Sequence, residues 1–539
     1  MRRHVPALTL LLSLATGLFA QGQPYDLLIR NARVVDGTGS PWFRADIAVR
    51  GDTIALIAPT IDAPATTVID ASGQVVAPGF IDLHVHAFGG AVLASGVLPI
   101  IEVPTADNYV RQGVTTLISG PDGFSPIPLG PVFERVRAQG ITPNLGAFVG
   151  HGSVRDAVIG TVNRPPTAAE LERMKSIVSQ AMRDGAFGMS TGLFYVPAAY
   201  SRTDEVIELA RVAGAMGGIH VSHMRNEAGG LIASVAETIE IGEKGGLPTQ
   251  VTHHKAIGKA VWGKTAETLR MMDEARQRGV DATSDVYPYL ASANTIQASL
   301  LPAWAQEGGR AEILKRLADP VTRRRILLET IQVILEERGG GDPHNIQLSA
   351  CEWNPALAGQ RLDDVAAGRG RSRSLEDSAD TALWLVENGG CGGIYFAMDE
   401  GDLQRVLKHP ATMVASDGGV VVFGRASPHP RSYGTFARVL GRYVRDLKVL
   451  SLEDAVRKMT SFPAQRIGLG DRGVLRAGLK ADIVVFDPAT VRDLATFERP
   501  HQYAEGVSTV VINGQVAFAD GAMTAARSGR ILYGPARSR

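Results

Sequence analysis

The stretch Pro78-Gly79-Phe80-Ile81-Asp82-Leu83-His84-Val85-His86 decides the fold and the chemistry expected of this chain. A short apolar run next to glycine and proline is typical of a buried strand. Side chains alternate along a strand, so His84 and His86 point to the same side and Val85 points away. Two imidazoles placed in this way can bind one metal ion. A lone His-x-His pair is only a weak indication of metal, so the sequence around it decides its meaning.

The sequence on either side of this stretch has two textures. Residues 25–77 and 471–530 consist of short apolar runs separated by turn residues, with no helical period. This pattern is typical of β-hairpins, and it predicts a small β-sandwich domain built from both chain ends. Residues 78–470 instead alternate strand-like runs with helical stretches. That alternation predicts an α/β fold, and roughly eight units predict a (β/α)8 TIM-like barrel. Residues 302–345 are helical and rich in charge, which predicts a helical insertion after a barrel strand.

Composition excludes some functions and indicates a compartment. Lys+Arg and Asp+Glu both number 55 among 539 residues, so no basic surplus points to nucleic acid. Residues 1–20 combine Arg2 and Arg3 with an apolar stretch too short to span a bilayer comfortably, which predicts a signal peptide and export to the periplasm or beyond. An uncleaved membrane anchor is the alternative. No later stretch has 18 uninterrupted apolar residues, so we expect no membrane partner for the mature form.

The only two cysteines, Cys351 and Cys391, share no Cys-x-x-Cys spacing. A cysteine zinc site or a framework of disulfides is therefore not expected. We predict two separate, inert thiols. A single disulfide between them is the alternative.

Further candidate ligands follow other strand-like runs. His223 and His253 each come directly after a short apolar run, where the carboxyl end of a strand is expected. Asp417 follows the run 412–416 and precedes two glycines, and by itself it would also suit an ordinary turn. Such a carboxylate can accept a proton from water and pass it to a leaving nitrogen. For the neighbouring histidines His220 and His254, packing or a supporting role is the preferred interpretation.

These residues together resemble a known group of enzymes. The stretch 78–86 after a β-rich start resembles the first-strand signature of the amidohydrolase superfamily. Over nearly the whole chain, finer motifs resemble the D-aminoacylase (N-acyl-D-amino-acid deacylase) family; they lie at 113–116, 150–155, 192–197, 285–289 and 429–436. The resemblance implies hydrolysis of an N-acyl-D-amino acid, with one or two Zn²⁺ ions as cofactor. It implies that His84, His86, His223 and His253 are metal ligands and that Asp417 is catalytic.

Residue 122 departs from the family pattern. Well-studied D-aminoacylases have a cysteine ligand after the third strand, within an Asn-Cys-Gly turn. This chain has Gly120-Pro121-Asp122-Gly123, which places Asp122 at that position. Aspartate can bind zinc through oxygen, so Asp122 is predicted as a ligand, with a plain turn residue as the alternative. Residues 185–195 contain no lysine, which argues against the relatives that bridge two metals with a carboxylated lysine.

The resemblance also assigns residues to the substrate. Tyr195 matches a tyrosine that donates to the developing oxyanion, and a packed loop aromatic is its alternative role. Lys255, Tyr287 and Arg431 match positions that bind the substrate carboxylate, for which an arginine offers a bidentate fork. Each of these could instead be an ion-pair residue. The expected partner is a small N-acyl amino acid or a dipeptide-like molecule.

Two rival functions remain at this point. One is a dipeptidase acting on peptides with a C-terminal D-residue, or another amide hydrolase of the same superfamily, because loops at the barrel mouth determine the substrate. The other is a binding protein on an inactive scaffold, against which the full set of histidines and Asp417 argues.

Overall fold

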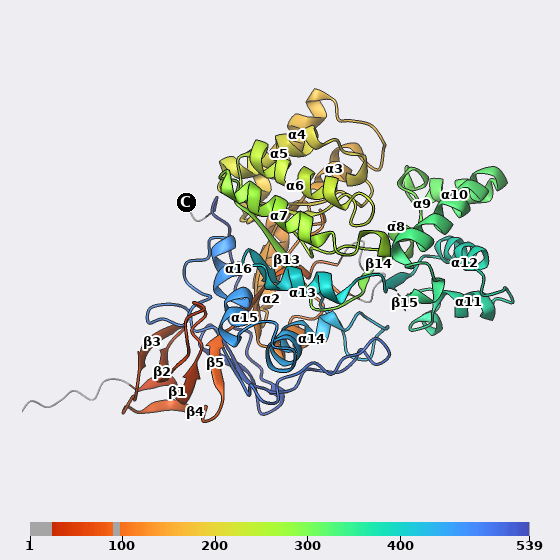
Figure 1. Cartoon of the computed structure of the whole chain (residues 1–539). Coiled ribbons are helices and arrows are strands. Elements are labelled where there is room, and N and C mark those ends of the chain that lie inside the picture. Colours follow the sequence, from red (N-terminus) through yellow and green to blue (C-terminus); the bar gives the residue numbers. More distant parts are fainter. Residues whose placement is uncertain (1–23, 90–96, 538–539) are drawn as a thin grey trace, which may run out of the picture.

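The computed structural model describes residues 24–89 and 97–537 (Figure 1). The predicted signal peptide, residues 1–20, lies outside these described residues. The described chain comprises a sheet domain, a set of parallel βα units and a third unit inserted between two of their strands. In the described ranges, no helix combines the length and apolar character needed to cross a membrane.

The sheet domain is built from both ends of the chain. Its nine strands run in the order β22-β21-β20-β19-β5-β1-β2-β3, with β4 paired to β1. The two ends meet where β5 and β19 pair antiparallel, with Ala77 opposite Val484. The strands are β1 (Tyr25–Val34), β2 (Phe43–Arg50), β3 (Thr53–Ala58), β4 (Ala65–Asp70), β5 (Val75–Pro78), β19 (Ile483–Phe486), β20 (Val507–Ile512), β21 (Gln515–Ala519) and β22 (Ala522–Met523).

The middle of the chain supplies parallel strands in the order of a TIM barrel. Two parallel ladders have the orders β18-β6-β7-β8 and β9-β10-β11-β12-β13-β17. Only Phe148 separates β8 from β9, and only residues 415–417 separate β17 from β18. If each of these pairs is taken as one strand, the two ladders contain eight strands. No ladder hydrogen bonds join the two sheets at these two breaks, so the barrel is not closed there. The strands are β6 (Phe80–His86), β7 (Val114–Ser119), β8 (Asn144–Ala147), β9 (Val149–Gly150), β10 (Gly188–Gly192), β11 (Ile219–His223), β12 (Thr249–Val251), β13 (Ala282–Val286), β17 (Thr412–Val414) and β18 (Gly418–Gly419).

Helices α4 to α7 pack side by side around these strands (Figure 1). In α4, Thr167 and Glu170 cap each other reciprocally at the start, while Met174 and Val178 are buried one turn apart. The helices of this part are α1 (Asp107–Val110), α2 (Gly130–Gln139), α3 (His151–Ile159), α4 (Ala168–Asp184), α5 (Thr203–Ala215), α6 (Leu231–Gly245), α7 (Thr265–Gln277), α13 (Glu400–Lys408), α14 (Arg431–Arg438), α15 (Leu452–Met459) and α16 (Ser461–Arg466).

An inserted unit lies between β13 and β17, on the opposite side of the barrel from the sheet domain (Figure 1). It has its own apolar core and an antiparallel sheet in the order β14-β16-β15. It extends on both sides of the predicted insertion at 302–345. The prediction fell short because the strands at the margins of this unit are too short to be recognised in the sequence. Its elements are β14 (Ser292–Thr295), α8 (Ile296–Leu300), α9 (Arg310–Ala318), α10 (Pro320–Val333), the π-helix η5 (Ile334–Arg338), β15 (Ile346–Ala350), α11 (Leu362–Gly368), α12 (Leu375–Glu387) and β16 (Gly392–Tyr395).

The two cysteines form a disulfide, so the prediction of separate thiols is wrong. In the inserted sheet Ala350 pairs with Gly392, which brings the adjoining Cys351 and Cys391 to a Cα–Cα distance of 4.5 Å. This distance suits a disulfide. The pairing depends on the register of β15 and β16, which the spacing of cysteines in the sequence does not indicate.

Candidate metal centre

Six residues predicted from the sequence meet at the carboxyl ends of the barrel strands as two overlapping groups. One group contains His84, His86, Asp122 and Asp417, and its ligand atoms all lie within 4.8 Å of one another. The second group, with the same spacing limit, contains Asp122, His223 and His253. Because Asp122 belongs to both groups, six residues form one continuous cluster. This end of a barrel is where the active sites of such folds are found.

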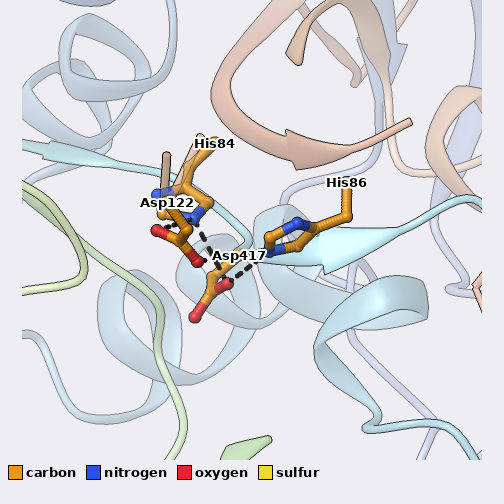
Figure 2. A group of neighbouring side chains, drawn as sticks. All are labelled: His84, His86, Asp122 and Asp417. Atoms are coloured by element: carbon orange, nitrogen blue, oxygen red, sulfur yellow. Dashed lines mark hydrogen bonds and ion pairs between the residues drawn. The ribbon is translucent and has the colours of Figure 1, made fainter. Parts of the chain in front are cut away.

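In the first group, two imidazoles face two carboxylates (Figure 2). The Nε2 atom of His84 is 3.3 Å from Oδ1 of Asp122 and 3.3 Å from Oδ1 of Asp417. The Nε2 atom of His86 is 3.1 Å from the same Asp417 oxygen and 3.6 Å from Oδ2 of Asp122. The alternation of β6 therefore places both histidines on one side, as predicted.

In the second group, two histidines approach the other side of Asp122. Its Oδ1 atom is 3.6 Å from Nδ1 of His223 and 3.5 Å from Nε2 of His253. These two ring nitrogens are themselves only 2.8 Å apart. Asp122 follows β7, which is the second barrel strand and not the third as predicted. The apolar run 75–86 divides at Gly79 into two strands: β5, which belongs to the sheet domain, and β6, which is the first strand of the barrel.

The cluster has the charge and the donor atoms expected for a bound cation. Although burial alone raises the pKa of Asp122, the neighbouring His84 and His223 hold that pKa well below its usual range. Burial likewise opposes ionisation of Asp417, but Arg431 and His84 hold its pKa well below the ordinary value. Nε2 of His84 and Oδ1 of Asp122 have no hydrogen-bond partner among the described residues. Buried imidazole nitrogens and ionised carboxylate oxygens are the donors that zinc takes.

Three residues of this cluster have a strained backbone. Asp122, His253 and Asp417 have φ angles of 57°, 36° and 51°, in a region that favours glycine. Hydrogen bonds hold the turns: the backbone N–H of His253 donates to Oδ1 of Asp285 at 2.7 Å, and that of Gly123 to the Ser190 hydroxyl at 3.1 Å. Strain of this kind is concentrated at functional sites because the surrounding structure must enforce it.

Tyr195 lies at the edge of the second group. Its hydroxyl is 3.3 Å from Nδ1 of His223 and accepts a hydrogen bond from the Asn294 amide at 3.0 Å. Burial raises the pKa of Tyr195 well above its usual value, and the negative charges of Asp122 and Asp417 raise it further. Tyr195 therefore remains a neutral phenol that can donate its proton in a hydrogen bond.

The three residues predicted to bind a carboxylate lie beside the cluster. Nη1 of Arg431 donates to Oδ2 of Asp417 at 2.7 Å. The Tyr287 ring lies near two cations, with its centre 4.8 Å from Cζ of Arg431 and 5.5 Å from Nζ of Lys255. Lys255 is itself 2.5 Å from Oε1 of Glu227. A cavity lined by Tyr195 and Lys255 reaches the cluster at Asp122 and Asp417.

Some residues of the site were not predicted from the sequence. Glu227 is buried against His253 and Lys255, and it stands four positions after His223, which is the one signal that could have found it. Arg338 and Asn294 line the cavity from the inserted unit, far in sequence from any recognised motif. His220 lies outside both groups and is hydrogen-bonded to the hydroxyls of Thr191 and Thr249.

A sequence profile described as the amidohydrolase family matches residues 135–518, which is more than half of the chain. The chain belongs to the amidohydrolase family. This amidohydrolase is 38% identical to the D-aminoacylase of Alcaligenes xylosoxydans xylosoxydans, over 95% of this chain and 98% of that one. It is 37% identical to the N-acyl-D-glutamate deacylase of the same organism, over 94% and 96%.

Solved structures support the same relationship. An N-acyl-D-glutamate deacylase from Bordetella bronchiseptica, complexed with zinc and a phosphonate inhibitor that mimics the tetrahedral intermediate, superposes with a TM-score of 0.80. It shares 35% identity and covers 95% of this amidohydrolase and 100% of its own chain. A D-aminoacylase studied for its binuclear metal centre has a TM-score of 0.79 and 34% identity, with coverage of 95% and 100%.

Proposed function

We propose that this amidohydrolase is a zinc-dependent N-acyl-D-amino-acid deacylase, which hydrolyses the amide bond to a carboxylate and a free D-amino acid. The observation that carries the proposal is the buried cluster in which Asp122 is shared by two groups of histidines beside Asp417. The relatives that match almost the whole chain are deacylases of N-acyl-D-amino acids, and one of them is complexed with zinc.

The residues of the cluster fit one or two zinc ions. His84, His86 and Asp417 would hold one ion, His223 and His253 would hold the other, and Asp122 would lie between them. Zinc bound there supplies a Lewis acid and lowers the pKa of water to about 7. The neighbouring charges keep both carboxylates ionised, as a ligand set for zinc requires.

Asp417 is placed to move the proton that the reaction requires. Arg431 holds Oδ2 of Asp417 and leaves Oδ1 facing the histidines, so one oxygen is fixed and the other faces the reacting centre. In our mechanism Asp417 accepts a proton from the attacking water and delivers it to the amide nitrogen as the C–N bond breaks. The water oxygen forms a new bond to the acyl carbon, which becomes the carboxylate product, and the transferred proton leaves with the amine of the amino acid.

Tyr195 and the cations bind the two ends of the substrate. The neutral Tyr195 hydroxyl donates to the acyl oxygen as negative charge develops on it, an interaction whose loss typically costs on the order of 10²–10³ in rate. Arg431 and Lys255, both close to the Tyr287 ring, provide the positive field that a free carboxylate requires. We assign the carboxylate of the amino acid moiety to this region.

The substrate class can be tested directly. Zinc-loaded protein should hydrolyse N-acetyl-D-amino acids and leave the matching N-acetyl-L compounds intact. L-D dipeptides in the same assay test the rival dipeptidase function, because the acyl group on the nitrogen of their C-terminal D-residue is an amino acid with a free amine. Faster turnover of the dipeptides than of any N-acetyl-D substrate would favour that rival.

We also propose that the chain is exported to the periplasm or beyond, with residues 1–20 as its signal peptide. The positive start and apolar stretch of these residues support this proposal. The disulfide between Cys351 and Cys391 supports it independently, because disulfides persist in oxidising compartments. Fractionation of the native host should recover the protein outside the cytoplasm without residues 1–20, whereas full-length cytoplasmic protein would contradict export.

A further inference from the structure

Glu227 is a completely buried carboxylate behind the second group of ligands, in the loop between β11 and α6. Its Oε1 atom is 3.1 Å from Nδ1 of His253 and 2.5 Å from Nζ of Lys255. Its Oε2 atom is 3.7 Å from Nε2 of His223 and 3.6 Å from Nη2 of Arg338. One carboxylate therefore faces the outer nitrogens of two histidine rings whose inner nitrogens face Asp122.

The protonation of His253 depends on which neighbour its Nδ1 atom meets. Lys255 Nζ is 2.7 Å from this atom, but an ammonium group is a donor without any lone pair to offer. If Nδ1 accepted from Lys255, the neutral ring would carry its proton on Nε2, where it would point at Asp122 and block a metal. If Nδ1 instead carries the proton, its acceptor is Glu227, and Nε2 presents a free lone pair to the cluster.

The short approach between the rings points to the same arrangement. Nε2 of His253 and Nδ1 of His223 lie 2.8 Å apart and both face Oδ1 of Asp122. Two unprotonated nitrogens aimed at one place suit a shared cation. The outer nitrogen of His223 has no hydrogen-bond partner among the described residues, and Glu227 is the carboxylate nearest to it.

We propose that Glu227 is a positioning residue that holds His253, and through its second oxygen His223, in the ring tautomer with the metal-facing nitrogen unprotonated. Lys255 and Arg338 help to keep this carboxylate charged, because Nζ of Lys255 is 2.5 Å from its Oε1 atom and Nη2 of Arg338 is 3.6 Å from its Oε2 atom. The inference deepens the proposed function and rests on it, because it assigns to Glu227 the orientation of zinc ligands. Carboxylates that accept from the outer nitrogen of such histidines orient the ring and raise its basicity.

The test compares Glu227→Gln with a matched control, Glu205→Gln, in the mature chain. Glu205 is also buried against a histidine and an arginine, His151 and Arg155, but lies outside the cluster. Competition with a chelator should show that E227Q binds zinc about 10- to 100-fold more weakly than the wild type. E205Q should bind zinc as the wild type does, and circular dichroism should show all three proteins folded.

Histidine ¹⁵N NMR of the metal-free protein at alkaline pH supplies a readout that is independent of zinc. We expect wild-type His253, assigned from the signal lost in H253Q, to carry its proton on Nδ1, and a larger Nε2–H population in E227Q. Equal tautomers and equal zinc affinities in wild type and E227Q would overturn the inference and leave the deacylase function intact. The Nδ1–H tautomer in a protein that binds no zinc would instead refute the proposed function and leave the inference standing.

Discussion

Asp122 lies between the two groups of histidines. It stands at the position where the family pattern has a cysteine ligand. Its two oxygens reach the ligand atoms of His84, His86, His223 and His253. Asp122→Ala should therefore weaken zinc binding by at least as much as the loss of a supporting carboxylate, about 10-fold or more. Chelator competition measures this change. An alanine variant with full zinc content and an unchanged rate would remove Asp122 from the ligand set.

The role of Asp417 in proton transfer can be tested separately from its role as a metal ligand. Asp417→Asn keeps an oxygen in place but cannot accept a proton, so kcat should fall by about 10²–10⁴-fold even at saturating zinc. Turnover should be measured together with bound zinc, because lost metal would lower the rate for a different reason. A fully zinc-loaded variant within threefold of the wild-type kcat would exclude proton transfer by Asp417.

His220 gives the folded protein a dependence on pH. Burial, with the nearby His151 and Arg466, lowers the pKa of His220 from its ordinary value of 6.5 to about 3. Above pH 6.5 the residue is neutral in both states. Between pH 6.5 and about 3, His220 is protonated in the unfolded chain but neutral in the folded protein. The free energy of unfolding therefore falls as the pH falls. The slope from this residue reaches about 1.4 kcal/mol per pH unit.

The variant His220→Gln should lose this component. Its free energy of unfolding, measured by urea titration from pH 7 to pH 4.5, should fall less steeply with acid than that of the wild type. Parallel curves for the two proteins would show that His220 does not contribute.

Among the elements, the inserted unit has a covalent link that can be removed. The disulfide joins the end of β15 to the start of β16 across 40 residues of sequence. By loop-closure entropy, a link of this length stabilises the folded state by about 4 kcal/mol. The double variant Cys351→Ser/Cys391→Ser should lower the midpoint of thermal unfolding while leaving the metal cluster assembled. A midpoint unchanged from the oxidised wild type would contradict this contribution.

The elements that carry the site differ in how well the sequence predicts them. His84 and His86 were predictable because alternation along a strand is a local rule, whereas Asp417, which by itself would suit an ordinary turn, was predicted through the family resemblance. Arg338 was not, because it reaches the cavity from a π-helix whose position depends on the packing of the inserted unit. The prediction of separate thiols failed for the same reason, since the register of two short strands is a tertiary property.

At the scale of the whole molecule, buried polar contacts join the C-terminal part of the sheet domain to the barrel. Asp482 of the sheet domain pairs with Arg472 and accepts a hydrogen bond at 3.0 Å from the amide of Asn144 on β8. Asn513 donates to the same Asn144 at 2.8 Å. The mixed architecture was predictable from the two kinds of pattern in the sequence. The two contacts with Asn144 connect residues more than 300 positions apart, so they required the structure.

The overlap of the two ligand groups at Asp122, at the mouth of the parallel strands, is the central feature of the molecule. It predicts that amide hydrolysis depends on zinc and that the cluster binds no more than two ions.

The most direct test is a titration of the metal-free protein with zinc, in which bound zinc and turnover of paired N-acetyl-D- and N-acetyl-L-amino acids are followed together. We predict no turnover without zinc and hydrolysis of the D-substrates that appears as the ions bind. Full turnover in metal-free protein, or hydrolysis confined to the L-substrates, would contradict the assignment.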